Sequence, residues 1–195
     1  MIKIAIIDEG VDAGHTRLLD SKVIGYTIKE SDGNLYSLGT DPHMDATGHG
    51  TAIASIIHKI VPEAELHSVR LFAAGGKISE QLLTEGIKHC LNIEGLRVVN
   101  ISMGIAVSTP SSALFNACRT LSESGVLIVA SSHNFPHVEC FPAHFPFEPS
   151  MPNLNLGFFV NLKSIFPSAA KPFDNVPAQN AGSDSKETEI FVESL

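Results

Sequence analysis

Strand-like apolar segments alternate with amphipathic segments along the first two thirds of the chain. The apolar segments lie at residues 4–7, 23–28, 66–72, 96–101 and 126–130. Between them, residues 51–57, 78–91 and 111–123 place small or apolar side chains at helical spacing, so these segments predict helices. Strands that alternate with helices in this way predict an α/β fold with a parallel β-sheet flanked by helices on both faces.

An aspartate and a histidine stand where this pattern changes from apolar to polar. Asp8 follows the strand at 4–7 and precedes a turn, which places it at the carboxyl edge of the sheet, where catalytic groups collect. His49 lies between Gly48 and Gly50 at the start of a predicted helix. A carboxylate can hold one ring nitrogen of such a histidine and leave the other to act as a base. Alone, Asp8 is equally explained as a turn residue and His49 as a solvated one; together they favour a catalytic pair.

Four motifs follow one another in a characteristic order along residues 2–146. They are Asp8-Glu9-Gly10, Gly48-His49-Gly50-Thr51, Val99-Asn100-Ile101-Ser102-Met103-Gly104, and residues 126–134 with the segment 140–146 that follows them. In sequence and order they resemble the motifs of the subtilisin-like serine proteases, the subtilases of peptidase family S8. The resemblance implies a three-layer α/β/α domain that hydrolyses peptide bonds, and it leaves open that the fold is incomplete at its carboxyl end.

The resemblance also assigns roles to individual residues. Asp8 would fix the tautomer of His49, His49 would take the proton of the nucleophile, and Asn134 would stabilise the oxyanion. His133 precedes Asn134 where the family usually has glycine. The strand that pairs with an extended peptide substrate corresponds to three residues: Asn100, Ser102 and Gly104.

The nucleophile of the family is not recognisable in this chain. The family carries it in a Gly-Thr-Ser motif at a helix start, and no serine after Asn134 follows Gly-Thr. Ser150 precedes a methionine as in the family, but it comes too soon after Asn134 to allow the intervening strands. Ser183 lies in a stretch with linker composition. Neither serine is predicted to be the nucleophile.

Three hypotheses about function therefore stay open. The chain is a subtilisin-like endopeptidase whose serine is supplied unconventionally or by a partner chain, or a pseudoprotease that binds a peptide or protein partner without cutting it, or a truncated product. The expected partner in the first two hypotheses is a peptide or protein substrate.

The composition of the chain changes after residue 146. Six of the eleven prolines lie from 146 onward, and residues 178–188 are rich in polar and small residues. Residues 157–162 are compatible with one more strand, whereas residues 189–192 are too short to assign. We therefore expect a subtilisin-like domain over residues 1–162 and a divergent, flexible tail over residues 163–195.

Length and charge limit the remaining classes of function. With 195 residues, 44% of them hydrophobic, the chain can bury the core of one domain. A net charge of -8 argues against a nucleic-acid partner, which needs a basic surface. No apolar run reaches transmembrane length, so no membrane partner is expected. The N-terminus lacks the pattern of a signal peptide, which predicts a cytoplasmic location.

No cofactor and no metal is expected. Three cysteines form an odd set without a disulfide framework. Two groups of possible metal ligands are weak: Asp41, His43 and Asp45 in one loop, and His133, His137, Cys140 and His144 in another. Pro136 and Pro142 prevent a continuous helix through the second group. The first is better explained as a solvated loop, and no carboxylate-rich loop predicts calcium.

Overall fold

A six-stranded sheet forms the centre of the structure, a computed structural model that describes residues 1–31, 34–38, 43–45, 47–73, 76–132, 138–145 and 189–192. The strand order is β4-β3-β6-β1-β7-β9. The strands are β1 (Lys3–Asp8), β3 (Lys22–Ser31), β4 (Asn34–Leu38), β6 (Glu65–Ala73), β7 (Leu96–Ile101) and β9 (Leu127–Ala130). All neighbouring strands are parallel except β3 and β4, which form an antiparallel pair at one edge. The predicted parallel sheet is confirmed, with an antiparallel edge strand that the apolar pattern did not predict.

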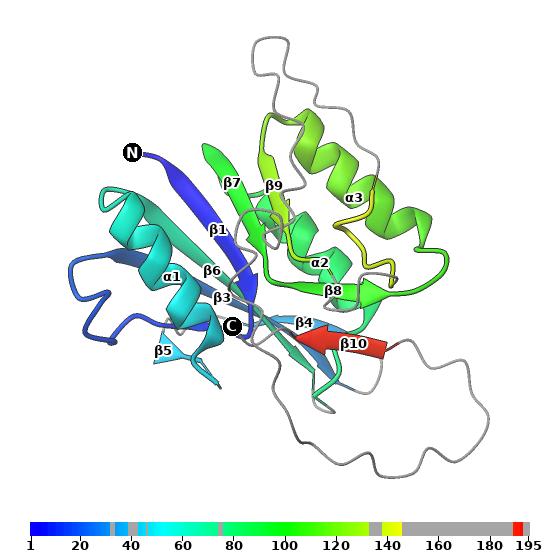
Figure 1. Cartoon of the computed structure of the whole chain (residues 1–195), viewed down its shortest axis with the longest axis horizontal. Helices are drawn as coiled ribbons and strands as arrows, with labels where there is room; N and C mark the ends of the chain where they lie inside the picture. The colour runs from blue at the N-terminus through cyan, green and yellow to red at the C-terminus, as the bar shows by residue number, and fades with distance from the viewer. Residues whose placement is uncertain are drawn as a thin grey trace.

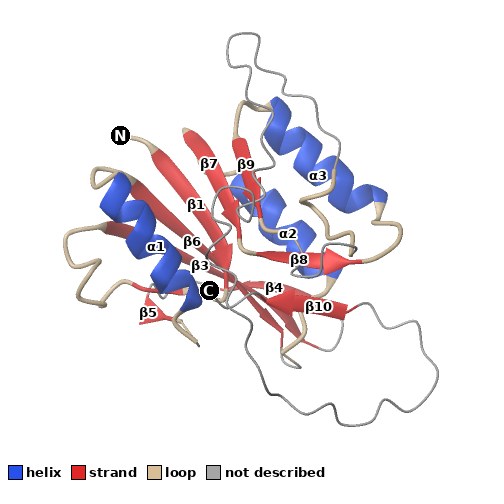
Figure 2. Ribbon diagram, viewed as in Figure 1, coloured by secondary structure: helices blue, strands red, loops and turns tan. Residues whose placement is uncertain are grey.

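Three helices cover the two faces of this sheet (Figures 1 and 2). Helix α1 (His49–Ile60) lies on one face, and α2 (Glu80–Cys90) and α3 (Ser112–Glu123) lie on the other. Ser79 and Ser111 cap α2 and α3, because their side chains accept hydrogen bonds from backbone N–H groups three residues on. The predicted layers of helix, sheet and helix are confirmed.

Alternation along β1 divides the hydrophobic core into two parts. Ile4 and Ile6 face α1 and join a cluster with Leu66, whereas Ala5 and Ile7 join the larger cluster under α2 and α3. Successive side chains of a strand point to opposite faces, so β1 is buried on both sides. Its last residue, Asp8, is also buried and lies at the carboxyl edge of the sheet.

Two short antiparallel pairs lie beside the main sheet. Strand β2 (Val11–Asp12) pairs with β5 (His43–Met44), and β8 (Met103–Ala106) pairs with β10 (Glu189–Val192). Strand β10 belongs to the segment 163–195 that the composition separates from the domain. Residues 157–162 and the boundary at residue 162 lie outside the described residues, so the domain division stays a prediction.

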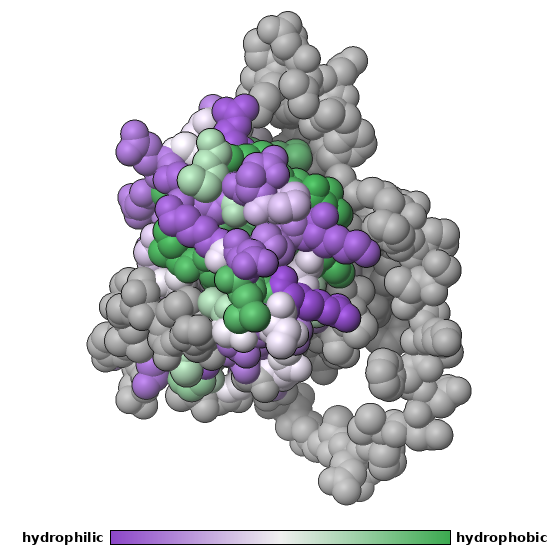
Figure 3. Space-filling model, turned by 90° about the vertical axis from the view of Figure 1, so that its left-hand side faces the viewer, coloured by the Kyte–Doolittle hydropathy of each residue, from purple (hydrophilic) through white to green (hydrophobic). Residues whose placement is uncertain are grey.

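The outer surface on the α1 side is mixed in character. Figure 3 shows hydrophilic and hydrophobic residues interspersed over the described part of this face. On α1, Ile56 and Ile60 are exposed to 52% and 73%. Scattered apolar side chains are ordinary on a protein surface, and we assign no partner to this face. None of the helices in the described part of the chain combines the length and the apolar composition needed to cross a bilayer.

Candidate active site

Asp8 and His49 meet at the carboxyl edge of the sheet. Asp8 ends β1 and His49 begins α1, and both are buried. The Nδ1 atom of His49 lies 3.1 Å from Oδ1 and 3.0 Å from Oδ2 of Asp8. An ionised carboxylate only accepts hydrogen bonds, so Nδ1 carries a hydrogen atom and donates a hydrogen bond to Asp8. The other ring nitrogen, Nε2, is then the basic atom.

Two glycines allow the start of α1 to approach the turn after β1. A Cβ atom on Gly50 would lie 2.0 Å from the carbonyl oxygen of Gly10 and 3.2 Å from Cβ of Asp8. Gly10 has a φ of 131°, and a Cβ atom there would lie 1.7 Å from the carbonyl oxygen of Met44. Any larger residue at either position would collide with backbone. The glycines therefore set the distance between the Asp8 strand and the His49 helix.

Asp45 caps the helix that carries His49. Its carboxylate accepts hydrogen bonds from the N–H groups of Gly48 and Thr51, both at 2.9 Å, and from the hydroxyl of Thr51. Desolvation raises the pKa of Asp45, but these hydrogen bonds outweigh it and hold the pKa below its usual value. Sequence analysis placed Asp45 in a solvated loop, whereas the structure makes it a capping residue. Of the other two residues in that group of possible metal ligands, His43 lies in β5 and Asp41 lies outside the described residues.

Glu9 adds a further carboxylate beside His49. Its side chain accepts hydrogen bonds from the N–H and the hydroxyl of Thr47, and its carbonyl accepts one from Nε of Arg70 at 2.9 Å. Burial is the main cause that raises the pKa of Glu9, and the charges of Asp45 and Asp8 raise it further. Sequence analysis did not identify this residue, although its place in the Asp8-Glu9-Gly10 motif was a signal.

The carboxylates shift the titration of His49. The hydrogen bond to Asp8 raises the pKa of His49, desolvation opposes it, and the charges of Asp8, Glu9 and Asp45 add to the rise. The net direction is upward from 6.5. The imidazolium form is therefore stabilised, which suits a group that accepts a proton during a reaction.

Strand β8 begins next to this pair. The N–H of Ser102 donates to the carbonyl of Ile7 at 3.3 Å, directly before Asp8. Nδ2 of Asn100 donates to Oγ of Ser102 at 2.6 Å. A Cβ atom on Gly104 would lie 2.2 Å from Sγ of Cys140, so the segment 138–145 packs closely on β8. Of the three predicted peptide-binding residues, Asn100 and Ser102 thus lie beside the end of β1 that carries Asp8, and Gly104 follows in β8.

Comparison with known proteins identifies the family of this chain. Residues 1–148 match the Peptidase_S8 or subtilase family. The chain belongs to the subtilase family. It is 30% identical over 142 residues to the minor extracellular protease Vpr of Bacillus subtilis (strain 168) and to subtilisin Savinase of Lederbergia lenta. The match covers 68% of this chain but 18% and 48% of those relatives, so the chain spans less than half the length of either.

Solved structures of subtilisin-like proteases share the fold. The prenylagaramide maturation protease PagA superposes with a TM-score of 0.59 and 25% identity, over 74% of this chain and 50% of that chain. The self-cleaved protease domain of PatA superposes with a TM-score of 0.58 and 25% identity, over 74% and 54% of the two chains. The expected subtilisin-like fold class is therefore confirmed.

Other residues of the expected subtilase machinery lie outside the described residues. They include Asn134, which the family resemblance assigns to the oxyanion hole and whose role stays a prediction. Ser150 and Ser183, neither of which is predicted to be the nucleophile, also lie outside the described residues.

Possible metal ligands do not gather in the described part of the chain. No group of three or more His, Cys, Asp or Glu side chains that could hold a metal ion occurs there. Of the cluster that includes Cys140, His133 and His137 are outside the described residues, and His144 turns back to the backbone of Cys140. The three cysteines of the chain are buried.

Proposed function

We propose that this subtilase domain binds extended peptides and hydrolyses peptide bonds, with Asp8 and His49 as its orienting and general-base residues. The observation that carries the proposal is the contact of both Asp8 carboxylate oxygens with Nδ1 of His49, at 3.1 and 3.0 Å. This contact fixes the tautomer with its lone pair on Nε2. A free Nε2 lone pair next to a peptide-binding strand is what activation of a hydroxyl nucleophile requires.

The reaction proceeds by proton transfer through His49. Nε2 takes the proton of a serine hydroxyl while its oxygen attacks the peptide carbonyl, and Asp8 stabilises the imidazolium that forms. Nε2 then gives this proton to the departing amine as the C–N bond breaks, and the acyl group stays on the serine oxygen. Water next attacks the acyl carbonyl while His49 takes the water proton, and the serine oxygen leaves with that proton. Asn134 would donate a hydrogen bond to the oxyanion. The serine is not assigned to a residue of this chain: it would be supplied unconventionally or by a partner chain.

A second function is favoured by the missing Gly-Thr-Ser motif. Without a serine nucleophile, the same edge would still bind an extended peptide, because pairing needs only backbone groups. The domain would then act as a pseudoprotease that holds a peptide or a protein partner.

Fluorophosphonate labelling followed by peptide mapping separates the two functions. In the hydrolase, one serine is labelled in the wild type, and the label is lost in His49→Ala. His58→Ala is the matched control, because His58 lies on the same helix but at its last turn. Absence of label on folded wild-type protein would contradict hydrolysis by this chain alone. Binding of a peptide without label would support the pseudoprotease.

A further inference from the structure

Both edges of strand β8 are paired within the chain. On one side, the N–H of Ile105 donates to the carbonyl of Phe141 at 2.8 Å, and the carbonyl of Ile105 accepts from the N–H of Phe141 at 2.9 Å. Backbone groups of successive residues in a strand point to opposite edges. Gly104 and Ala106 therefore present their backbone groups to the other edge, where β10 lies.

Strand β10 matches this second edge in register. It pairs Phe191 with Gly104 and Glu189 with Ala106. Because Gly104 and Ala106 point toward β10, these two pairs are the hydrogen-bonded ones of an antiparallel ladder. The N–H groups of Phe191 and Glu189 thus point to β8, whereas the N–H of Ile190 points away from it.

The direction of β10 leads toward the Asp8–His49 pair. Its register runs from Glu189 opposite Ala106 to Val192 opposite Met103. Ser102, the residue immediately before β8, donates a backbone hydrogen bond to the carbonyl of Ile7, which precedes Asp8. Figure 1 shows β10, in red, antiparallel to β8. An extended peptide laid along this edge in the same direction presents the residues after the paired segment to His49.

We propose that residues 189–192 are an intramolecular ligand of the peptide-binding edge, which an extended peptide substrate must displace. The inference rests on the proposed function, because it takes the β8 edge as the place where substrate binds. A strand edge accepts one additional strand, and the opposite edge of β8 is already used by Phe141. Covalent attachment gives the segment a high effective concentration, so it inhibits binding of peptides in trans.

Hydrogen exchange at single amides of the full-length chain tests the pairing. In the wild type, we expect the amides of Gly104 and Ala106 to exchange about tenfold or more slowly than in Phe191→Pro. Proline there removes the N–H that points to β8. Ile190→Pro is the matched control, because it removes an N–H that points away. The amide of Ile105, bonded to Phe141, is an internal reference that stays unchanged. Equal exchange of Gly104 and Ala106 in the wild type and in Phe191→Pro would overturn the inference.

A second measurement needs no variant. Ile105 and Ile190 are opposite each other in a pair without mutual hydrogen bonds, where the two Cα atoms approach most closely. The wild-type protein should therefore show a nuclear Overhauser contact between the α protons of these residues. Its absence in folded protein would also overturn the inference.

Competition links the segment to peptide binding. A fluorescent peptide that carries residues 186–195 should bind Phe191→Pro about tenfold or more tightly than the wild type. N-methylation of this peptide at Phe191 should abolish binding, whereas N-methylation at Ile190 should not. If the amides of Gly104 and Ala106 are protected in the wild type but the peptide does not bind even to Phe191→Pro, the pairing stands and the proposed function is contradicted. If these amides are unprotected and the peptide binds, only the inference is contradicted.

Discussion

Nδ1 of His49 lies at nearly equal distances, 3.1 and 3.0 Å, from the two carboxylate oxygens of Asp8. The donor is shared by both acceptors, so the ring is held in one orientation without depending on one oxygen. Asp8 ends a strand that is buried on both faces, and His49 begins a helix whose Gly50 packs against the backbone of Gly10. Neither backbone can therefore shift without disturbing the packing around it. The pair is thereby held in place before any substrate arrives.

Replacement of Asp8 by asparagine should uncouple the pair. Asp8→Asn removes the charge and offers Nδ1 an amide, so we expect the pKa of His49 to fall. If the chain is a hydrolase, the fluorophosphonate labelling rate should also fall, by roughly 10⁴-fold, the size of the effect of this substitution on turnover in a serine triad. The pKa is followed by NMR titration of the His49 ring. Asp20→Asn, at an exposed aspartate, should change neither quantity, and an unaltered His49 pKa in Asp8→Asn would contradict the assigned contact.

The pH dependence of labelling should follow the raised pKa of His49. The neutral ring is the active base, so the labelling rate should rise with pH through a midpoint above 6.5. The contribution of this ring to stability has the opposite dependence: it is fully present below 6.5 and is lost as the pH rises through the folded-state pKa. The rate is measured from pH 5 to 9. A midpoint below 6.5 would show that the carboxylates do not control the ring.

Alanine at Gly50 should destabilise the domain. The added Cβ meets the backbone oxygen of Gly10 at 2.0 Å, and we expect a loss of roughly 1–3 kcal/mol in the free energy of unfolding. Gly86→Ala is the matched control, because its Cβ would approach no backbone atom: it would lie 2.8 Å from the end of the Leu71 side chain, which can move, and in ordinary contact with Cγ2 of Ile7 at 3.7 Å. Helix propensity favours alanine there, so Gly86→Ala should cost less than about 1 kcal/mol or nothing. Equal costs in urea unfolding would contradict the role of Gly50 as a spacer.

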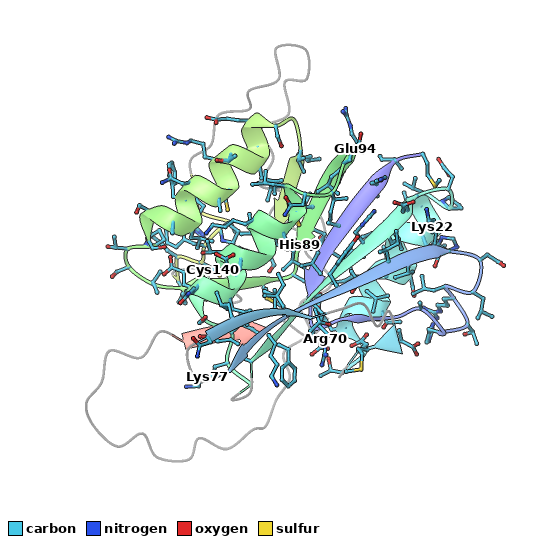
Figure 4. The ribbon with its side chains drawn as sticks, turned by 180° about the vertical axis from the view of Figure 1, so that it is seen from behind. Lys22, Arg70, Lys77, His89, Glu94 and Cys140 are labelled. Carbon is cyan, nitrogen blue, oxygen red and sulfur yellow. The ribbon has the colours of Figure 1, made fainter. Side chains whose placement is uncertain are left out.

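Acid should destabilise the end of the sheet remote from the active site. Glu65 at the start of β6 lies against Lys22 and accepts a hydrogen bond from Nε2 of His67 at 2.8 Å. Figure 4 shows Lys22 well separated from Arg70, which lies opposite Asp8 in the sheet. The hydrogen bond from Lys22 lowers the pKa of Glu65 to about 2, and burial lowers the pKa of His67.

The pKa values of Glu65 and His67 are both lowered in the folded protein, so both groups stabilise the fold less as the pH falls. Neutral His67 stabilises the fold fully above pH 6.5, and this contribution is lost as the pH falls below that value. Ionised Glu65 stabilises the fold above pH 4.5, and its contribution is lost toward pH 2. Urea midpoints measured between pH 7 and 2 should therefore fall in both windows, and Glu65→Gln should flatten the lower one. A midpoint of Glu65→Gln that falls as steeply as that of the wild type below pH 4.5 would contradict this assignment.

The apolar pattern predicted the layers of the fold because burial leaves a local signature. Strand β1 is covered on both faces and therefore has a continuous apolar run. Helices α2 and α3 are covered on one side and therefore have an apolar stripe. The edge strand β4 (Asn34–Leu38) lacks that signature, because Asn34 and Ser37 interrupt its apolar residues, whereas the other edge strand, β9, has a continuous apolar run. The end of β3 contains Lys29 and Glu30, so its apolar run stops before the strand does.

The site was predictable only where its residues stand next to backbone signals. Asp8 follows a strand and His49 is flanked by glycines, so both were identified. The capping role of Asp45 depends on how the loop folds back to Gly48 and Thr51, which spacing alone does not show. The pairing of β10 with β8 depends on a register between distant parts of the chain, for which a four-residue segment gives no local evidence.

The pairing of Gly104 with Phe191 also gives the chain an order of events during synthesis. Helices α2 and α3 and strands β1 to β9 are all translated before residues 189–192. Domains fold as they emerge from the ribosome, and contacts between distant residues form late. Every nascent chain therefore passes through a period in which β8 has an open edge, and that period ends only after residues 189–192 have been translated.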